Sequence, residues 1–145
     1  MNIEIEKMNL SDLKTIKDIL ITDFDDFWNY NILKEELQNE NSSYIVAKLG
    51  CEVVGFAGMK IVIDEADIMN IVTKKTYRNH GIGTLLLKHL ILLSNKLNLT
   101  SVSLEVNEEN IIAIHLYEKF GFKNIGIRKN YYQNRNGIIM AKKLN

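Results

Sequence analysis

Proline is absent from this chain of 145 residues, and cysteine occurs once, as Cys51. One cysteine excludes a disulfide within the chain, and no zinc site is expected from this cysteine and three histidines that are scattered along the sequence. Cys51 follows Gly50 between two apolar stretches, so we expect it in a turn or in the core rather than as a nucleophile. A chain without disulfides suits a reducing compartment.

Net charge is missing as well, because 18 basic side chains balance 18 acidic ones. Such a chain is not expected to bind nucleic acid or an anionic membrane through its overall field. Long hydrophobic runs are lacking too, and the N-terminus MNIEIEKMNL has no apolar core of a signal peptide. We therefore expect a cytoplasmic protein with neither a nucleic-acid partner nor a membrane partner.

What the chain does contain is a regular succession of short apolar strands and amphipathic helices, without linker or repeat, so residues 1–145 are predicted to form one domain. The expected strands cover 3–6, 43–48, 52–63, 66–73, 101–106, 122–128 and 137–142, and the expected helices cover about 11–20, 31–40, 83–97 and 111–120. Asn9 or Ser11 can cap the first helix, and a turn around 134–137 joins the last strands. This order predicts an α/β fold, with a mixed, mostly antiparallel central sheet of about seven strands and helices on both faces.

One stretch, 71–93, runs from an apolar strand through a glycine-containing loop into a leucine-rich helix. The loop reads Arg78-Asn79-His80-Gly81-Ile82-Gly83, and Thr84 leads into the helix. Glycines let backbone N–H groups turn toward one point, and the N-terminus of a helix favours negative charge. The stretch therefore predicts a binding site for an anion such as a pyrophosphate, to which Arg78 adds positive charge.

The element order, this loop and a second signature from Asn110 to Phe122 resemble the GNAT superfamily of acyl-CoA N-acyltransferases, whose loop pattern is R/Q-x-x-G-x-G/A. The resemblance implies acetyl-CoA as the acyl donor and no metal. It implies that the fourth strand contacts the pantetheine arm and that the loop holds the pyrophosphate. The residues assigned to the donor in this way are Ile71, Val72, Thr73, Arg78, Asn79, His80, Gly81, Ile82, Gly83, Thr84 and Asn110.

Within the superfamily, residues from about 65 to 141 look like the ribosomal-protein-alanine N-acetyltransferases of bacteria, the RimI type. The matching segments are Leu104-Glu105-Val106, Leu116-Tyr117-Glu118 and Asn130-Tyr131-Tyr132. This similarity implies that the acceptor is a protein N-terminus, namely the N-terminal alanine of a small-subunit ribosomal protein. Thr73-Lys74-Lys75 replaces the family's Asp-Pro before the loop, and Phe27-Trp28 matches its Pro-Trp element only roughly.

Acetyl transfer to an amine needs a base for the nitrogen and a proton for the departing thiolate. An N-terminal amine has a pKa of ~7.7–8.0, so a carboxylate at a strand end can take its proton directly or through a water. Glu105 matches the family's proton acceptor and Tyr117 its proton donor. Without the resemblance, Glu105 would be a solvated charge, Tyr117 a half-buried ring and Asn110 a helix cap.

Alternatives remain for the acceptor and for the aromatic segments. The loop recognises the donor alone, so the acceptor can instead be a small-molecule amine or a lysine. A protein of another functional class, a CoA-binding module without catalytic activity, is the second alternative. Retention of both Glu105 and Tyr117 argues against a binding module. The rings of Phe27, Trp28, Tyr131 and Tyr132 can either line an acceptor groove or simply pack. His80 and His115 are expected to be structural or solvated.

Overall fold

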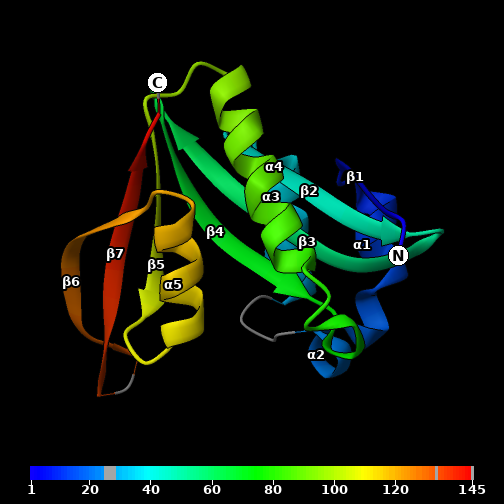
Figure 1. Cartoon of the computed structure of the whole chain (residues 1–145). Helices are drawn as coiled ribbons and strands as arrows, with labels where there is room; N and C mark the ends of the chain where they lie inside the picture. The colour runs from blue at the N-terminus through cyan, green and yellow to red at the C-terminus, as the bar shows by residue number, and fades with distance from the viewer. Residues whose placement is uncertain (25–28, 133, 145) are drawn as a thin grey trace.

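Seven strands form one sheet in the order β1-β2-β3-β4-β5-β7-β6 in the computed structural model (Figure 1). The structure describes residues 1–24, 29–132 and 134–144, without the side chain of Tyr132. The strands are β1 (Ile3–Lys7), β2 (Ser42–Leu49), β3 (Glu52–Val62), β4 (Glu65–Thr73), β5 (Ser101–Asn107), β6 (Lys123–Tyr132) and β7 (Arg135–Lys143). The helices are α1 (Leu10–Thr15), α2 (Leu20–Asp23), α3 (Tyr30–Gln38), α4 (Ile82–Lys96) and α5 (Ile111–Lys119), with 3₁₀ turns η1 (Lys17–Ile19) and η2 (Lys75–Tyr77). The expected mixed, mostly antiparallel sheet of seven strands is confirmed.

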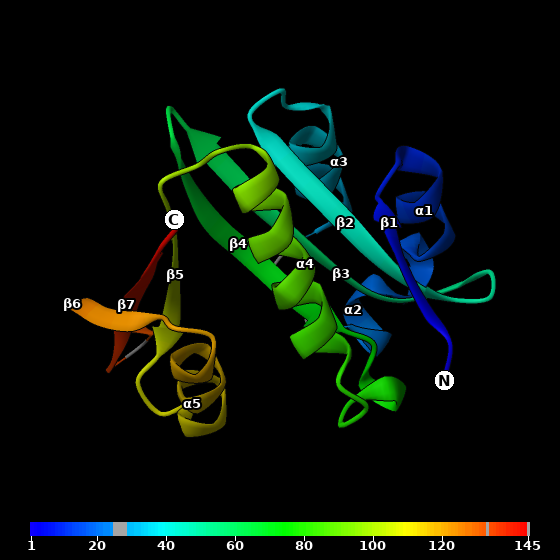
Figure 2. The ribbon, with the colours of Figure 1, turned by 45° about the horizontal axis from the view of Figure 1, so that its top comes forward.

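The central pair of the sheet, β4 and β5, is its one parallel pair and is held together over only three residue pairs. Glu65 pairs with Ser101, Ala66 with Val102 and Asp67 with Ser103, after which the strands diverge. Figures 1 and 2 show the result, in which β1 to β4 form one half of the sheet and β5 to β7 the other. The diverging ends leave an opening in the middle of the sheet.

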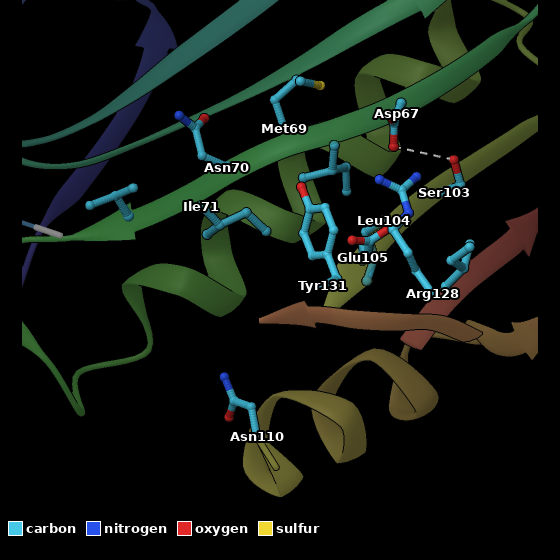
Figure 3. A pocket seen from close by; sticks show the side chains of 13 residues that line it. Asp67, Met69, Asn70, Ile71, Ser103, Leu104, Glu105, Asn110, Arg128 and Tyr131 are labelled. Carbon is cyan, nitrogen blue, oxygen red and sulfur yellow. Dashed lines mark hydrogen bonds and ion pairs between the residues drawn. The ribbon is translucent and has the colours of Figure 1, made fainter. Parts of the chain in front are cut away.

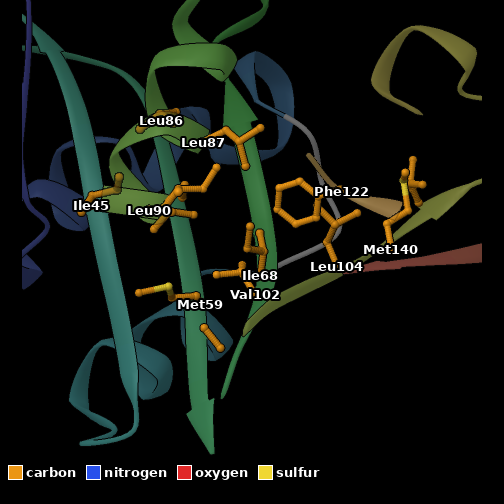
Figure 4. Packing of buried hydrophobic residues seen from close by; sticks show 14 of the residues in the cluster. Ile45, Met59, Ile68, Leu86, Leu87, Leu90, Val102, Leu104, Phe122 and Met140 are labelled. Carbon is orange, nitrogen blue, oxygen red and sulfur yellow. The ribbon is translucent and has the colours of Figure 1, made fainter. Parts of the chain in front are cut away.

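Helices cover both faces, as expected. The helix α4 lies across one face, where Leu86, Leu87 and Leu90 pack against Ile68 of β4 and, across the opening, Phe122 (Figure 4). The other face is covered by α1 to α3, around buried Leu13, Leu33 and Phe56. Because α4 contacts both halves of the sheet, its apolar face ties them together where strand pairing has ended.

A β-bulge in β4 changes the direction of the side chains that follow it. Gly58 of β3 pairs with Asn70 and Met59 with Ile68, so Met69 has no opposite residue. Side chains of a regular strand alternate between faces, and one extra residue shifts that alternation. Ile68 therefore faces α4, whereas Asn70 and Val72 face the layer of α1 to α3.

The N-terminal helix is a correction, because the single helix expected up to Leu20 is divided into α1, η1 and α2. Asn9 is the N-cap of α1 and forms a capping box with Asp12. The break follows the hydrogen bond that the Thr15 hydroxyl donates to the Asp12 carbonyl at 2.7 Å. Such local bonds compete with the helix ladder.

The last turn is a second correction. It was expected around 134–137, but β6 continues to Tyr132, which pairs with Arg135 at the start of β7. Arg135, Asn136 and Gly137 therefore belong to a strand. The positive φ of 71° at Asn134 suits the turn itself, because asparagine tolerates that conformation.

The position of Cys51 agrees with the expectation from the sequence. Cys51 is exposed in the hairpin between β2 and β3, so it belongs to a turn. No helix among residues 1–24, 29–132 and 134–144 has the length and apolarity that crossing a membrane requires.

Candidate active site

A pocket of about 980 Å³ opens between the diverging ends of β4 and β5 (Figure 3). Its walls come from both halves of the sheet, from the start of α5 and from the last hairpin. The lining residues are Asp67, Ile68, Met69, Asn70, Ile71, Val72, Ser103, Leu104, Glu105, Asn110, Arg128, Tyr131 and Ile139.

The backbone of β4 turns hydrogen-bonding groups toward this opening. Lys74 donates its N–H to the Val54 carbonyl of β3 at 2.8 Å. Hydrogen-bonded pairs alternate along an antiparallel ladder, so Val72 also bonds to β3 while Ile71 and Thr73 direct their N–H and C=O groups the other way. Of the three residues expected to contact a pantetheine arm, Ile71 and Thr73 thus have suitable backbone groups, and Val72 has a buried side chain.

The glycine loop ends at an uncapped helix terminus. Gly81 is the N-cap of α4 with a φ of 78°, a left-handed conformation that favours glycine. No side chain among the described residues caps the helix, so the first N–H groups, those of Ile82, Gly83 and Thr84, have no helical acceptor. This arrangement suits an anion. Arg78, Asn79 and His80 are exposed just before it.

Glu105 lies on β5 with its side chain on the face of α1 to α3, opposite to buried Leu104 and Val106. Its Oε1 forms an ion pair with the Arg128 Nε at 3.3 Å. Its Oε2 is buried and has no hydrogen-bond partner among the described residues. One carboxylate oxygen is therefore held in place while the other keeps an unused acceptor inside the pocket.

Arg128 and Tyr131 of β6 close the pocket beside Glu105. Between Arg128 and Tyr132 the β6–β7 register shifts, and Asn130 has a positive φ of 55°. The Arg128 guanidinium lies over the Tyr131 ring at 4.8 Å from its centroid. Irregular strands of this kind redirect side chains, and here Tyr131 stands beside Glu105 (Figure 3).

Asp67 is the second carboxylate of the pocket. The Ser103 hydroxyl donates to its Oδ1 at 3.4 Å across the last pair of β4 and β5. Burial raises the pKa of the Asp67 carboxyl, an effect that the Ser103 hydrogen bond and the nearby Arg128 charge oppose. Arg128 thus faces two carboxylates at the place where the strands separate.

The remaining predicted site residues include two at α5, of which Asn110 lines the pocket and Tyr117 does not. Asn110 lines the far end of the pocket and caps α5, where its Oδ1 accepts the Ala113 N–H at 3.2 Å. Tyr117 is half-buried on α5 with its ring 5.9 Å from that of Phe122, and it is not among the lining residues. His115 is exposed on α5. Phe27, Trp28 and the Tyr132 side chain lie outside the described residues.

Four polar lining residues were assigned no role from the sequence, namely Asp67, Asn70, Ser103 and Arg128. Each sits on a strand whose alternation was visible, but the divergence of β4 from β5 and the bulge at Met69 have no local sequence pattern. Among the described residues, no three His, Cys, Asp or Glu side chains gather in a group suited to a metal ion.

Comparison with known proteins gives a consistent result. Residues 13–122 match the Acetyltransferase (GNAT) family. The chain is 39% identical over 121 residues to the [ribosomal protein bS18]-alanine N-acetyltransferase of Haemophilus influenzae, which covers 79% of this chain and 80% of that protein. The crystal structure of the ribosomal-protein-S18-alanine N-acetyltransferase from Escherichia coli superposes with a TM-score of 0.91 at 30% identity, over 99% of this chain and 95% of that one.

A more distant structure is informative about the fold. The PaiA N-acetyltransferase from Thermoplasma acidophilum, solved in complex with coenzyme A, has a TM-score of 0.77 at 21% identity. The likeness covers 99% of this chain and all of that one. At this identity it shows a shared fold alone.

Proposed function

Since the chain belongs to the Acetyltransferase (GNAT) family, we propose that it transfers the acetyl group of acetyl-CoA to a protein N-terminal amine. The acceptor we propose is the N-terminal alanine of a small-subunit ribosomal protein. The names of the relatives from Haemophilus influenzae and Escherichia coli support this acceptor. The agreement of the whole fold with the Escherichia coli enzyme supports it further.

One observation carries the chemistry, namely the buried Glu105 Oε2 without a partner among the described residues. A buried oxygen with an unused lone pair favours a hydrogen-bond donor, and a positively charged amine is the strongest donor that an acetyl acceptor offers. Glu105 takes one proton from that amine, directly or through a water. The neutral nitrogen then attacks the acetyl carbon, and the bond between that carbon and the thioester sulfur breaks, so that coenzyme A leaves as a thiolate. The nitrogen releases its second proton to water as the amide forms.

The proton that the thiolate needs comes from the other side of the sheet. Tyr117 lies on α5, which packs on the face of α4, whereas Glu105 faces α1 to α3. We assign the Tyr117 phenol as the proton donor. The base and the acid then act from opposite faces of the opening between β4 and β5.

The residues present suit the donor. Acetyl-CoA supplies a thioester whose acetyl group is the one transferred. The uncapped N–H groups at the start of α4 would hold its pyrophosphate, with Arg78 and the loop from Asn79 to Thr84 around them. The open-side backbone groups of Ile71 and Thr73 would hold its pantetheine arm, and Asn110 lies at the entry to α5.

Release of coenzyme A, measured as free thiol with a panel of acceptors, tests this function. The panel contains a peptide that begins with alanine, its N-acetylated form, a blocked peptide with an internal lysine, and a small primary amine. We expect turnover with the free alanine peptide and none with its blocked form. Faster turnover with the lysine peptide or the small amine would replace the proposed acceptor, and no release with any acceptor would favour a binding module.

Two variants test the assigned roles. Glu105→Gln should reduce turnover by roughly 100-fold or more while acetyl-CoA binding stays nearly unchanged, because the amide cannot take a proton. Tyr117→Phe should lower kcat more than it changes KM. Glu118→Gln, at an exposed carboxylate on α5, is the matched control. Full activity of Glu105→Gln across the pH range would remove Glu105 from the mechanism.

A further inference from the structure

Besides Glu105, the structure describes two side chains whose buried polar atoms have no hydrogen-bond partner, Asn70 and Tyr44. Both polar atoms of the Asn70 amide are buried, and Asn70 lines the pocket between β4 and β5. A buried amide without a partner is costly, because folding removes its hydrogen bonds to water. Neither the donor site nor the assigned acid and base uses it.

Asn70 owes its position to the bulge at Met69. The shift in alternation puts its side chain on the face of α1 to α3, the face on which Glu105 also lies. Asn70 and Ile71 consequently leave β4 in opposite directions (Figure 3). Asn70 is thus on the acceptor side of the opening, while Ile71 packs toward α4 and the donor side.

Tyr44 approaches Asn70 across the neighbouring strand. Tyr44, Gly58 and Asn70 are consecutive partners in β2, β3 and β4. The Tyr44 ring lies over Gly58, where any side chain would come within 2.1 Å of its Cζ. Burial raises the pKa of the Tyr44 phenol and the Glu36 charge raises it further, whereas a hydrogen-bonding contact with Asn70 lowers it, so the phenol keeps its proton. Their geometry is nevertheless not that of a hydrogen bond.

We propose that the Asn70 amide binds the first peptide group of the acceptor and so selects a peptide α-amine over other amines. This inference rests on the proposed function. A carboxamide offers a donor and an acceptor in one plane, which matches the C=O and N–H of a peptide unit. A lysine side chain and a simple amine carry no peptide group next to the reacting nitrogen.

The test is a thermodynamic cycle between residue 70 and the first peptide bond. Wild type and Asn70→Ala are assayed with a peptide that begins with alanine and with the same peptide carrying an ester in place of its first peptide bond. The ester lacks the N–H and has a weaker acceptor oxygen. We expect wild type to favour the amide by about tenfold or more in kcat/KM, and Asn70→Ala to lose that preference while its KM for acetyl-CoA is unchanged.

Two further variants guard against indirect effects. Asn70→Asp keeps the size of the side chain and its hydrogen-bond acceptor oxygen but loses the N–H donor. It should therefore lose the part of the preference for the amide peptide that depends on the peptide carbonyl. Asn95→Ala, at an exposed position of α4, should behave as wild type. Thermal unfolding should show Asn70→Ala to be as stable as wild type, since the amide has no described partner to lose.

The possible results separate the two proposals. An equal loss with both peptides, or an amide preference that survives in Asn70→Ala, would overturn the role of Asn70 and leave the proposed function standing. Failure of wild type to acetylate any peptide N-terminus would overturn the proposed function and this inference with it.

Discussion

Glu105 occupies space that a neighbouring glycine leaves free. A Cβ at Gly137, on β7, would lie 3.0 Å from the Glu105 Oε2 and 3.1 Å from its Cδ. That separation is too small for an ordinary contact, so a methyl group there would push the carboxylate. The orientation of the proposed base therefore depends on a residue that contributes no side chain.

Gly137→Ala should lower kcat by about tenfold, because even a small displacement of a reacting group from its productive geometry is costly. The KM for acetyl-CoA should not change, since Gly137 lies outside the glycine loop. Gly126→Ala on β6 is the matched control, because its Cβ would meet the Ile139 Cδ1 at an ordinary 3.7 Å. Steady-state kinetics with the alanine peptide measures both variants, and equal activities would separate Gly137 from the geometry of Glu105.

At the scale of elements, Glu52 connects β3 to the segment that leads into the glycine loop. Its Oε2 pairs with the Lys74 Nζ at 2.9 Å, and its Oε1 accepts the Tyr77 hydroxyl at 3.1 Å. Lys74 directly precedes the 3₁₀ turn η2 between β4 and Arg78, and Tyr77 is the last residue of that turn. The two hydrogen bonds fix this turn, where the family's Asp-Pro is missing.

Glu52→Gln should reduce the free energy of unfolding at pH 7 by about 0.2–1 kcal/mol, the usual range for a solvent-screened ion pair. The Lys74 hydrogen bond lowers the pKa of the Glu52 carboxyl below its ordinary value of 4.5. A lowered pKa means that this stabilisation is complete above the unfolded pKa and is lost as pH falls through the folded one. Urea unfolding should thus show a smaller difference between wild type and variant at pH 4 than at pH 7.

The control for that comparison is Glu4→Gln, at an exposed position of β1. It should change the stability little at either pH. A difference between wild type and Glu52→Gln that is the same at pH 4 and at pH 7 would show that the charge of Glu52 does not fix the turn.

At the scale of the whole molecule, the proposed donor site joins β4 and the start of α4 to Asn110 at the start of α5. Acetyl-CoA at 100 times its Kd should therefore stabilise the fold by about 2.7 kcal/mol and raise Tm by about 5–10 °C. Pantetheine, which lacks the pyrophosphate, should have a much smaller effect. Differential scanning fluorimetry measures these shifts.

Substitutions at two glycines, one in the loop and one outside it, test whether the shift in Tm depends on the loop. Gly81 and Gly50 both have positive φ, at 78° and 62°, and both have open space around their Cα. Valine strains the backbone at either position. Gly81→Val should lose the shift in Tm caused by acetyl-CoA, whereas Gly50→Val, in the hairpin between β2 and β3, should be destabilised and still respond. Equal responses of the two variants would argue against the loop as the pyrophosphate site.

Much of this architecture could be predicted from the sequence, because the signals are local. Alternation in 101–106, the apolar helix after Gly81 and the two family signatures led to the sheet and to the donor loop. The acceptor side was harder, since it depends on a register shift at Met69, on the separation of β4 from β5 and on the irregular course of β6 around Asn130. These features result from pairing between distant strands, so Asp67 and Asn70 gave no signal of their own.

The single extra residue in β4 has a consequence for how such a chain is able to evolve. A substitution after Met69 alters one wall of one binding site. An insertion or deletion of one residue there would instead exchange the two walls, turning Asn70 toward α4 and Ile71 toward the opposite layer. We therefore expect the number of residues in this strand to be constrained more strictly than their types. New acceptors are more readily gained by changing side chains while the pairing register of β4 stays fixed.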